Sequence, residues 1–327
     1  MKQASRVELP VMTRPSQTSH TSRGYLTAFA AAIVLSTTAI FIRHLSVTYR
    51  LPALVLAFWR ELIVVVTLLV VLTIRRRVSL RVDKRHLAYL LVYGFVLWVF
   101  NALWTTSVVL NGAAVSTVLV YCSGAFTALL GWWLLKEHLG IIKLTAVVLS
   151  FGGCALVAGA NDPAVWQGNI PGIIVGILAG LAYAVYSLMG RTAANRGLNA
   201  WVTIMYTFAF AAGFMLVANL AGGGKLPGTA PAPADMFWLG DRWAGWGVLF
   251  LLAAGPTVAG FGLYNMSLGD LPSSVANLIV STEPVFTAVI AFLLLGERMT
   301  SVQLFGSLLI LGGVGLMRAF EREPAGV

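Results

Sequence analysis

The sequence has little charge: only 10% of its 327 residues are Asp, Glu, Lys or Arg. Soluble globular proteins carry about 25% charged residues, because their surface must be solvated. Here 58% of the residues are hydrophobic and the mean hydropathy is +0.85. The composition therefore excludes a soluble globular domain and predicts a polytopic membrane protein.

Cysteine and histidine are also scarce. The two cysteines, Cys122 and Cys154, lie in apolar runs, so the sequence offers no disulfide framework and no Cys-x-x-Cys metal site. The four histidines, at positions 20, 44, 86 and 138, form no His-x-x-x-His or His-Glu-x-x-His pattern. A Walker motif is absent as well. We therefore expect no metal, no other cofactor and no ATP hydrolysis.

The N-terminal residues lack the apolar core of a secretory signal, which needs a stretch of about 7–15 residues and a small-residue cleavage site. Residues 1–23 hold four basic residues among Ser, Thr, Gln and Pro. We expect this segment to be a disordered cytoplasmic tail. Residues 320–327 are expected to form a second, shorter cytoplasmic tail.

Ten hydrophobic segments are long enough to cross a bilayer, whose core of about 30 Å needs roughly 20 apolar residues in a helix. Most connections between them are very short, so neighbouring helices are expected to be antiparallel. The exception, residues 222–243, is rich in Gly and Pro and is expected to be a flexible external loop. The segments are 24–43, 52–74, 86–108, 112–135, 139–160, 169–191, 199–221, 244–268, 272–295 and 301–319.

The basic residues predict the orientation of these helices, because cytoplasmic loops are enriched in Lys and Arg. With the N-terminus inside, sixteen of the 22 Lys and Arg residues fall in cytoplasmic segments and five in external ones. Both termini are therefore expected in the cytoplasm. The same positions account for the net charge of +10 without nucleic-acid binding, since the basic residues sit at helix ends.

An internal repeat divides the chain into two halves. A shift of 160 residues aligns 112–156 with 272–316 without a gap, and thirteen of 45 positions are identical. The matches include Phe-Thr-Ala at 126–128 and 286–288, Glu137 with Glu297, and a Gly-Gly pair at 152–153 and 312–313. Because each half has five helices, an odd number, the second half enters the membrane from the opposite side. We predict two inverted five-helix repeats, 24–160 and 169–319, an architecture typical of transporters.

The chain resembles the EamA branch of the drug/metabolite transporter superfamily over residues 24 to 319. The resemblance rests on Glu283-Pro284, on Gly-Glu-Arg at 296–298, and on Phe-Trp-Arg at 58–60. The first half departs from the pattern, with Ser-Gly at 123–124 where Glu-Pro would stand. The resemblance implies a ten-helix secondary transporter of the bacterial inner membrane, often an exporter of amino acids or other small metabolites.

Three charged residues, Arg60, Glu61 and Glu283, lie well inside the hydrophobic segments rather than at their ends. At that depth a charge costs about 2.5–3.5 kcal/mol on insertion scales. Glu283 lies near the middle of its segment, and Arg60 is about 12 Å deep at 1.5 Å per residue. These depths allow an Arg60–Glu283 ion pair, whereas the adjacent Glu61 could satisfy Arg60 locally. A role in coupling and a purely structural role both remain open.

Two segments are interrupted at corresponding positions of the halves, by Gly124 and Pro284. Such paired interruptions are the best sequence indicator of a binding site at the bilayer midplane. Thr117 and Tyr121 align with Asn277 and Ser281 in the 160-residue register, so both halves present a polar stripe. Glu283 is about 200° from Ser281 on a continuous helix, which predicts that the two face different directions.

Aromatic rings near mid-membrane could stack on an apolar or cationic ligand, although packing alone would also explain them. Together with the polar stripes they define the predicted substrate-binding residues of the midplane cavity. These are Trp59, Trp104, Thr117, Tyr121, Tyr183, Tyr186, Asn277 and Ser281.

The sequence thus predicts an all-α secondary active transporter that moves a small molecule by alternating access, with proton coupling through Glu283 as one mechanism. An intramembrane enzyme is the alternative, but no nucleophile–base pair or metal set is visible at one depth. A passive channel or scaffold is a third interpretation. The bilayer is the expected partner, and the sequence leaves open whether the protein is a monomer or a homodimer.

Overall fold

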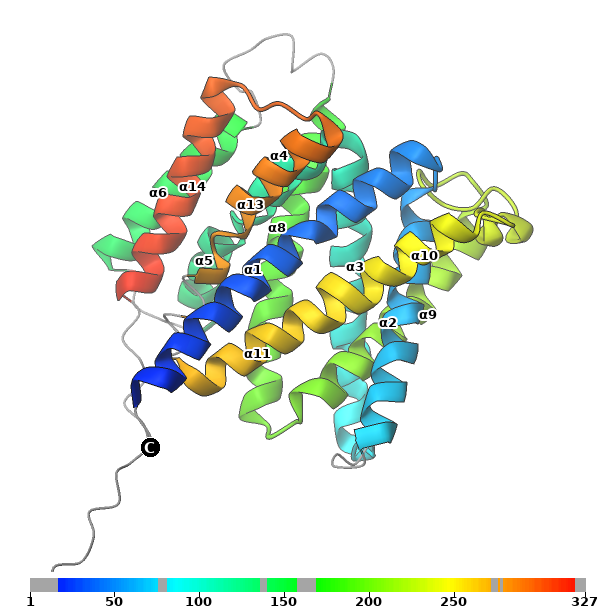
Figure 1. Cartoon of the computed structure of the whole chain (residues 1–327), viewed down its shortest axis with the longest axis horizontal. Coiled ribbons are helices and arrows are strands. Elements are labelled where there is room, and N and C mark those ends of the chain that lie inside the picture. Colours follow the sequence, from blue (N-terminus) through cyan, green and yellow to red (C-terminus); the bar gives the residue numbers. More distant parts are fainter. Residues whose placement is uncertain are drawn as a thin grey trace, which may run out of the picture.

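The computed structural model describes residues 17–75, 81–135, 140–157, 169–271, 276 and 279–320, and within these ranges the chain is helical with no strand. The helices stand side by side in a bundle (Figure 1). Seven of them are long and apolar enough to cross a membrane, and three further apolar helices are shorter. These findings confirm the prediction of an all-α polytopic membrane protein.

In the first half the helices are α1 (Gln17–Thr48), α2 (Ala53–Arg75), α3 (Lys84–Asn111), α4 (Ala113–Val120), α5 (Ser123–Leu135) and α6 (Ile141–Val157). In the second half they are α8 (Ile170–Asn195), α9 (Ala200–Gly222), the 3-10 turn η1 (Pro233–Phe237), α10 (Trp243–Leu252), the π-helix η2 (Ala253–Gly260), α11 (Phe261–Asp270), α13 (Glu283–Ile290), the π-helix η3 (Ala291–Leu295) and α14 (Ser301–Phe320).

Two expectations about the connecting segments are wrong. Helix α1 begins at Gln17, so residues 17–23 are helical rather than a disordered tail; residues 1–16 lie outside the described residues. The 222–243 connection is not loose either, because it buries Met236 and Leu239 against the bundle. Asn219 holds it at one end by accepting from the Ala230 amide at 3.1 Å. Its glycines serve tight turns, with φ of +75° at Gly224 and +84° at Gly228.

Polar caps define several helix starts. The Asn199 side chain accepts from the amides of Trp201 and Val202 at the start of α9. Asp83 caps α3 through the Arg85 amide and also contacts the Arg85 guanidinium at 2.6 Å. Those hydrogen bonds lower the pKa of the Asp83 carboxyl, which lies outside the hydrophobic span.

Helix interruptions occur at equivalent positions in the two halves. A turn at Tyr121 and Cys122 separates α4 from α5, and a turn at Ser281 and Thr282 precedes α13. The 160-residue register pairs these two turns residue for residue. Pro284 follows at the start of α13, where its missing N–H removes no helical hydrogen bond. A third interruption, the π-helix η2 around Pro256, has no counterpart in the sequence prediction.

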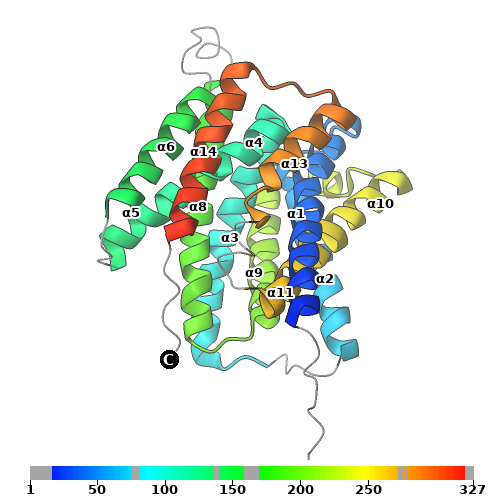
Figure 2. The same ribbon diagram turned by 60° about the vertical axis from the view of Figure 1, so that its left-hand side comes forward.

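Glycine allows close contact between α6 and α14, which lie against each other in both views (Figures 1 and 2). A Cβ on Gly153 would lie 2.5 Å from the Gly306 carbonyl oxygen, and one on Gly313 would lie 2.8 Å from that of Ala146. The neighbouring Gly152 and Gly312 meet nothing within 4 Å. One glycine of each repeated Gly-Gly pair is therefore required for packing.

Candidate functional site

A cavity of about 280 Å³ lies between the two halves of the chain. In the first half its walls come from α1, α2, α3, α4 and α5. In the second half they come from α8, α9, η2, α11, α14 and the segment around the start of α13. The two interrupted regions both reach it, Tyr121 from one and Ser281 from the other. Both halves therefore contribute to one central site.

Most of the predicted site residues meet at this cavity. Asn277 lies outside the described residues, and Pro284 is buried in the start of α13 and does not line the wall. The predicted residues that do line the cavity are Arg60, Trp104, Thr117, Tyr121, Gly124, Tyr183, Tyr186, Ser281 and Glu283.

Glu283 contacts the first half directly. The Tyr121 hydroxyl donates to Glu283 Oε2 at 3.1 Å and lies 3.4 Å from the Val280 carbonyl oxygen. Thr287, one turn further along α13, donates to the Glu283 carbonyl oxygen and to that of Ser36 in α1. The start of α13 is thus tied to helix α1 and to the turn after α4, both in the other half.

The expectation that Glu283 and Ser281 face different directions is wrong, because both line the cavity. The 200° estimate assumed a continuous helix through both residues. The turn at Ser281 and Thr282 breaks the helix between them, so the constant rotation per residue does not apply.

Arg60 is 3% exposed and lines the cavity. It does not form the ion pair with Glu283 that the sequence allowed: among the described residues no carboxylate makes an ion pair with Arg60. Its Nε atom is buried without a hydrogen-bond partner. Arg60 is therefore a buried cationic side chain with at least one N–H group that makes no hydrogen bond within the protein.

Glu61 and Asn101 form a second buried contact behind Arg60. Glu61 is fully buried, and its Oε1 accepts from the Asn101 side-chain amide at 2.8 Å, while Oε2 has no partner. Glu61 follows Arg60 directly in the chain and interacts with it electrostatically, although the ion pairs of the described residues do not include this pair. Asn101, which also lines the cavity, was not predicted, although an amide within a hydrophobic segment is the kind of signal that marks such sites.

Trp59 does not belong to this cavity, contrary to the prediction. Its ring packs against Phe58, Phe237 and Trp246, and its indole N–H donates to the Met236 carbonyl oxygen at 2.6 Å. Trp59 and Arg60 point about 100° apart on α2, and here Trp59 is directed at the 222–243 connection while Arg60 lines the cavity. Trp59 anchors the 222–243 connection instead.

An aromatic wall from α3 and α8 borders the cavity. The ring of Phe100 lies 5.1 Å from Tyr183 and 6.5 Å from Trp104, and Tyr183 lies 6.2 Å from Tyr186. These separations are typical of interacting aromatic pairs. Phe100 was not predicted, because its ring has no polar group that would distinguish it from the many apolar side chains of its helix.

The described residues contain no group of His, Cys, Asp and Glu suited to a metal. Cys122 and Cys154 are both buried and reduced. The cavity presents the Arg60 guanidinium, the Glu283 carboxyl group, hydroxyl groups and flat aromatic rings.

Comparisons with known proteins place this fold among transporters. A model described as the EamA-like transporter family matches residues 22–159 and again residues 170–319. An uncharacterized transporter of Synechocystis, sll1319, is 25% identical over 71% of this chain and 67% of its own length. The uncharacterized transporter YyaM of Bacillus subtilis is 21% identical over 82% of this chain and 85% of its own.

A solved structure titled only as a crystal structure of a protein superposes with a TM-score of 0.58. The superposition covers 94% of this chain and all of the other, at 18% identity. This likeness shows a shared fold.

Proposed function

This chain belongs to the EamA-like transporter family, and on that basis we propose that it is a secondary active transporter which carries a small metabolite through the central cavity by alternating access. The observation that carries the proposal is the cavity itself, which is shared by both halves and lined by Arg60 and Glu283. Charged side chains at this depth are rare in membrane proteins and generally mark a substrate or ion pathway.

The proposed architecture is ten transmembrane helices in two inverted repeats, 24–160 and 169–319. It is supported by the seven long spans together with three shorter apolar helices. It is supported also by the double match to the family model and by the paired turns at Tyr121 and Ser281. We propose that both termini are cytoplasmic and that the membrane is the bacterial inner membrane, on the distribution of basic residues and the family resemblance.

The proposed substrate class is amino acids or other metabolites of similar size. A volume of about 280 Å³ is just below the range of roughly 300–1,000 Å³ that is typical of small-molecule sites, which favours a small substrate. Arg60 offers a partner for a carboxylate, Glu283 for an ammonium group, and the rings of Phe100 and Trp104 for an apolar body. The direction of transport that we propose, export, follows the family resemblance, and Glu283 is the proposed site of proton coupling.

Substrate counterflow in proteoliposomes tests this function. Vesicles loaded with an unlabelled amino-acid mixture are diluted into trace radiolabelled amino acids, one at a time, after a thermal-shift screen has selected candidates. A transporter accumulates label transiently above equilibrium, whereas a channel equilibrates without overshoot and an enzyme or scaffold gives none. Absence of overshoot for every compound that stabilises the protein would contradict the proposal.

A further inference from the structure

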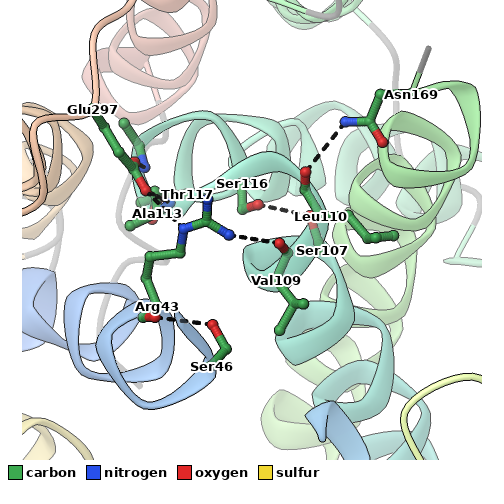
Figure 3. A network of polar contacts seen from close by, with 11 residues as sticks. Arg43, Ser46, Ser107, Val109, Leu110, Ala113, Ser116, Thr117, Asn169 and Glu297 are labelled. Atoms are coloured by element: carbon green, nitrogen blue, oxygen red, sulfur yellow. Dashed lines mark hydrogen bonds and ion pairs between the residues drawn. The ribbon is translucent and has the colours of Figure 1, made fainter. Parts of the chain in front are cut away.

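The carboxylate of Glu297 lies at the N-terminus of α4, in the other half of the chain (Figure 3). Its Oε1 accepts from the Ala113 amide at 3.0 Å and its Oε2 from the Ala114 amide at 3.1 Å. The first amides of a helix have no partner within that helix, and the helix dipole favours a negative charge beside them. Gly112, the residue at the cap position, has no side chain to satisfy them. A residue 184 positions away in sequence therefore caps α4.

Arg43 of α1 completes this anion site. Its Nε lies 3.3 Å from Glu297 Oε1, and its terminal nitrogen donates to the Val109 carbonyl oxygen near the end of α3 at 2.6 Å. Figure 3 shows the guanidinium between Glu297 and Val109. The two side chains are 29% and 18% exposed. The contact is therefore accessible enough to be rehydrated when it opens.

The backbone is shaped to admit the carboxylate. Gly112 has a φ of +83°, and a Cβ on it would lie 2.8 Å from Glu297 Oε1. On the opposite side, Gly296 caps the end of the π-helix η3 with a φ of +68°, and Glu297 follows directly. Both glycines adopt backbone conformations that other residues rarely take. The two glycines bring the Glu297 carboxylate and the α4 amides together.

The Glu297 contact is the second of two contacts between α4 and the α13–η3 segment; the first lies at the cavity. Tyr121, just after α4, contacts Glu283 at the start of α13, and Glu297 follows the far end of that same segment. The cap lies about 12 Å from Tyr121 along α4, at 1.5 Å per residue. Segments α4 and α13–η3 are therefore in contact both at the cavity and at the end of the bundle where α4 begins and η3 ends. If the cavity opens toward this end by separation of these two segments, Glu297 has to leave the α4 amides.

We propose that Arg43 and the N-terminus of α4 form an anion site that binds Glu297 as a releasable latch, closing the cavity toward this end of the bundle. The inference rests on the proposed alternating-access function. In the proposed topology this end is extracytoplasmic. Charge-assisted hydrogen bonds between the halves hold the latch closed, and water can replace them because the site is partly exposed.

Cysteine accessibility tests the latch without any substrate. Thr117→Cys is introduced into a background carrying Cys122→Ala and Cys154→Ala, and right-side-out membrane vesicles are treated with a membrane-impermeant thiosulfonate reagent. We expect Glu297→Ala and Arg43→Gln each to raise the labelling rate at position 117 at least threefold. In inside-out vesicles the same variants should label more slowly than the parent.

Asn199→Ala is the matched control, because Asn199 also caps two helix amides but both belong to its own half. It should lower the melting temperature without changing labelling. Equal labelling in parent and Glu297→Ala, or an equal rise in Glu297→Ala and Asn199→Ala, would overturn the latch. Should Glu297→Ala fail to fold, Gly112→Ala displaces the carboxylate instead and must give the same rise. Since labelling needs no substrate, failure of the counterflow assay leaves this result intact.

Discussion

Tyr121 donates a hydrogen bond to Glu283 across the boundary between the two halves, at 3.1 Å. Each residue lies at a helix interruption, and the two interruptions are equivalent in the 160-residue register. The contact joins two places where regular helical structure is interrupted. Rearrangement of the halves around the cavity would change the surroundings of the Glu283 carboxylate, which is why its charge is a candidate for coupling.

Glu283→Gln should keep the protein folded and abolish transport driven by a pH gradient. Gln has the size of a protonated Glu and cannot release a proton, so the site stays uncharged in both conformations. Exchange without a gradient should partly survive, and Glu283→Asp, which keeps the charge, should retain coupling. Gradient-driven uptake and melting temperature are measured on one preparation. Normal coupling in Glu283→Gln would rule out the proton role, and a lower melting temperature alone would indicate a structural one.

Arg60 and Glu61 should show a strong energetic coupling. Removing one partner of a buried pair of opposite charges costs on the order of 3–5 kcal/mol, whereas replacing both is often nearly neutral. Arg60→Met and Glu61→Gln should therefore each lower the thermal stability, and the double variant should recover most of the loss. A double-mutant cycle from thermal unfolding in detergent measures this. Additive losses would show that Glu61 does not balance the charge of Arg60.

Trp104 and Trp59 should respond differently to truncation. Trp104 lines the cavity, so Trp104→Ala should weaken binding of a stabilising amino acid severalfold, since an aromatic contact contributes about 1 kcal/mol. Trp59 packs beneath the 222–243 connection, so Trp59→Ala should lower stability and leave affinity nearly unchanged. Ligand titration by thermal shift measures both quantities. An affinity loss of equal size in Trp59→Ala would place that residue in the site.

The Gly-Gly pair of α6 offers a test of helix packing. Gly153→Ala places a Cβ 2.5 Å from the Gly306 carbonyl oxygen, so it should separate α6 from α14 and lower the melting temperature. Gly152→Ala meets open space and should be neutral or slightly stabilising, because Ala is favoured over Gly in helices by about 1 kcal/mol. Equal effects of the two substitutions would argue against the glycine contact.

The proposed topology predicts which side of the membrane each connection occupies. Reporter fusions after Arg77 and after Arg196 should be active on the cytoplasmic side, and a fusion after Gly222 on the opposite side. The reason is the concentration of basic residues on one side of the ten-segment scheme. An alkaline phosphatase fusion after Gly222 that stays inactive would break the ten-helix count.

Hydropathy alone determined that this chain is a helical membrane protein, because in a bilayer every backbone polar group must be satisfied within the segment. The internal repeat placed interruptions near Gly124 and Pro284, close to the observed turns. The directions of the side chains could not be predicted from the sequence in the same way. A helical wheel separated Ser281 from Glu283, and only the broken backbone brought both to the cavity.

Long-range pairing was decided by the tertiary structure. The sequence marked Glu297 as a repeated residue but could not show that its carboxylate caps Ala113 and Ala114 beside Arg43. It allowed Arg60 to pair with Glu283 or with Glu61, and neither ion pair is present among the described residues. Hydropathy and periodicity act along one helix, whereas the partner of a buried charge depends on the rotation and offset of helices far apart in sequence. Those quantities are set by packing, down to a single glycine such as Gly112 or Gly153.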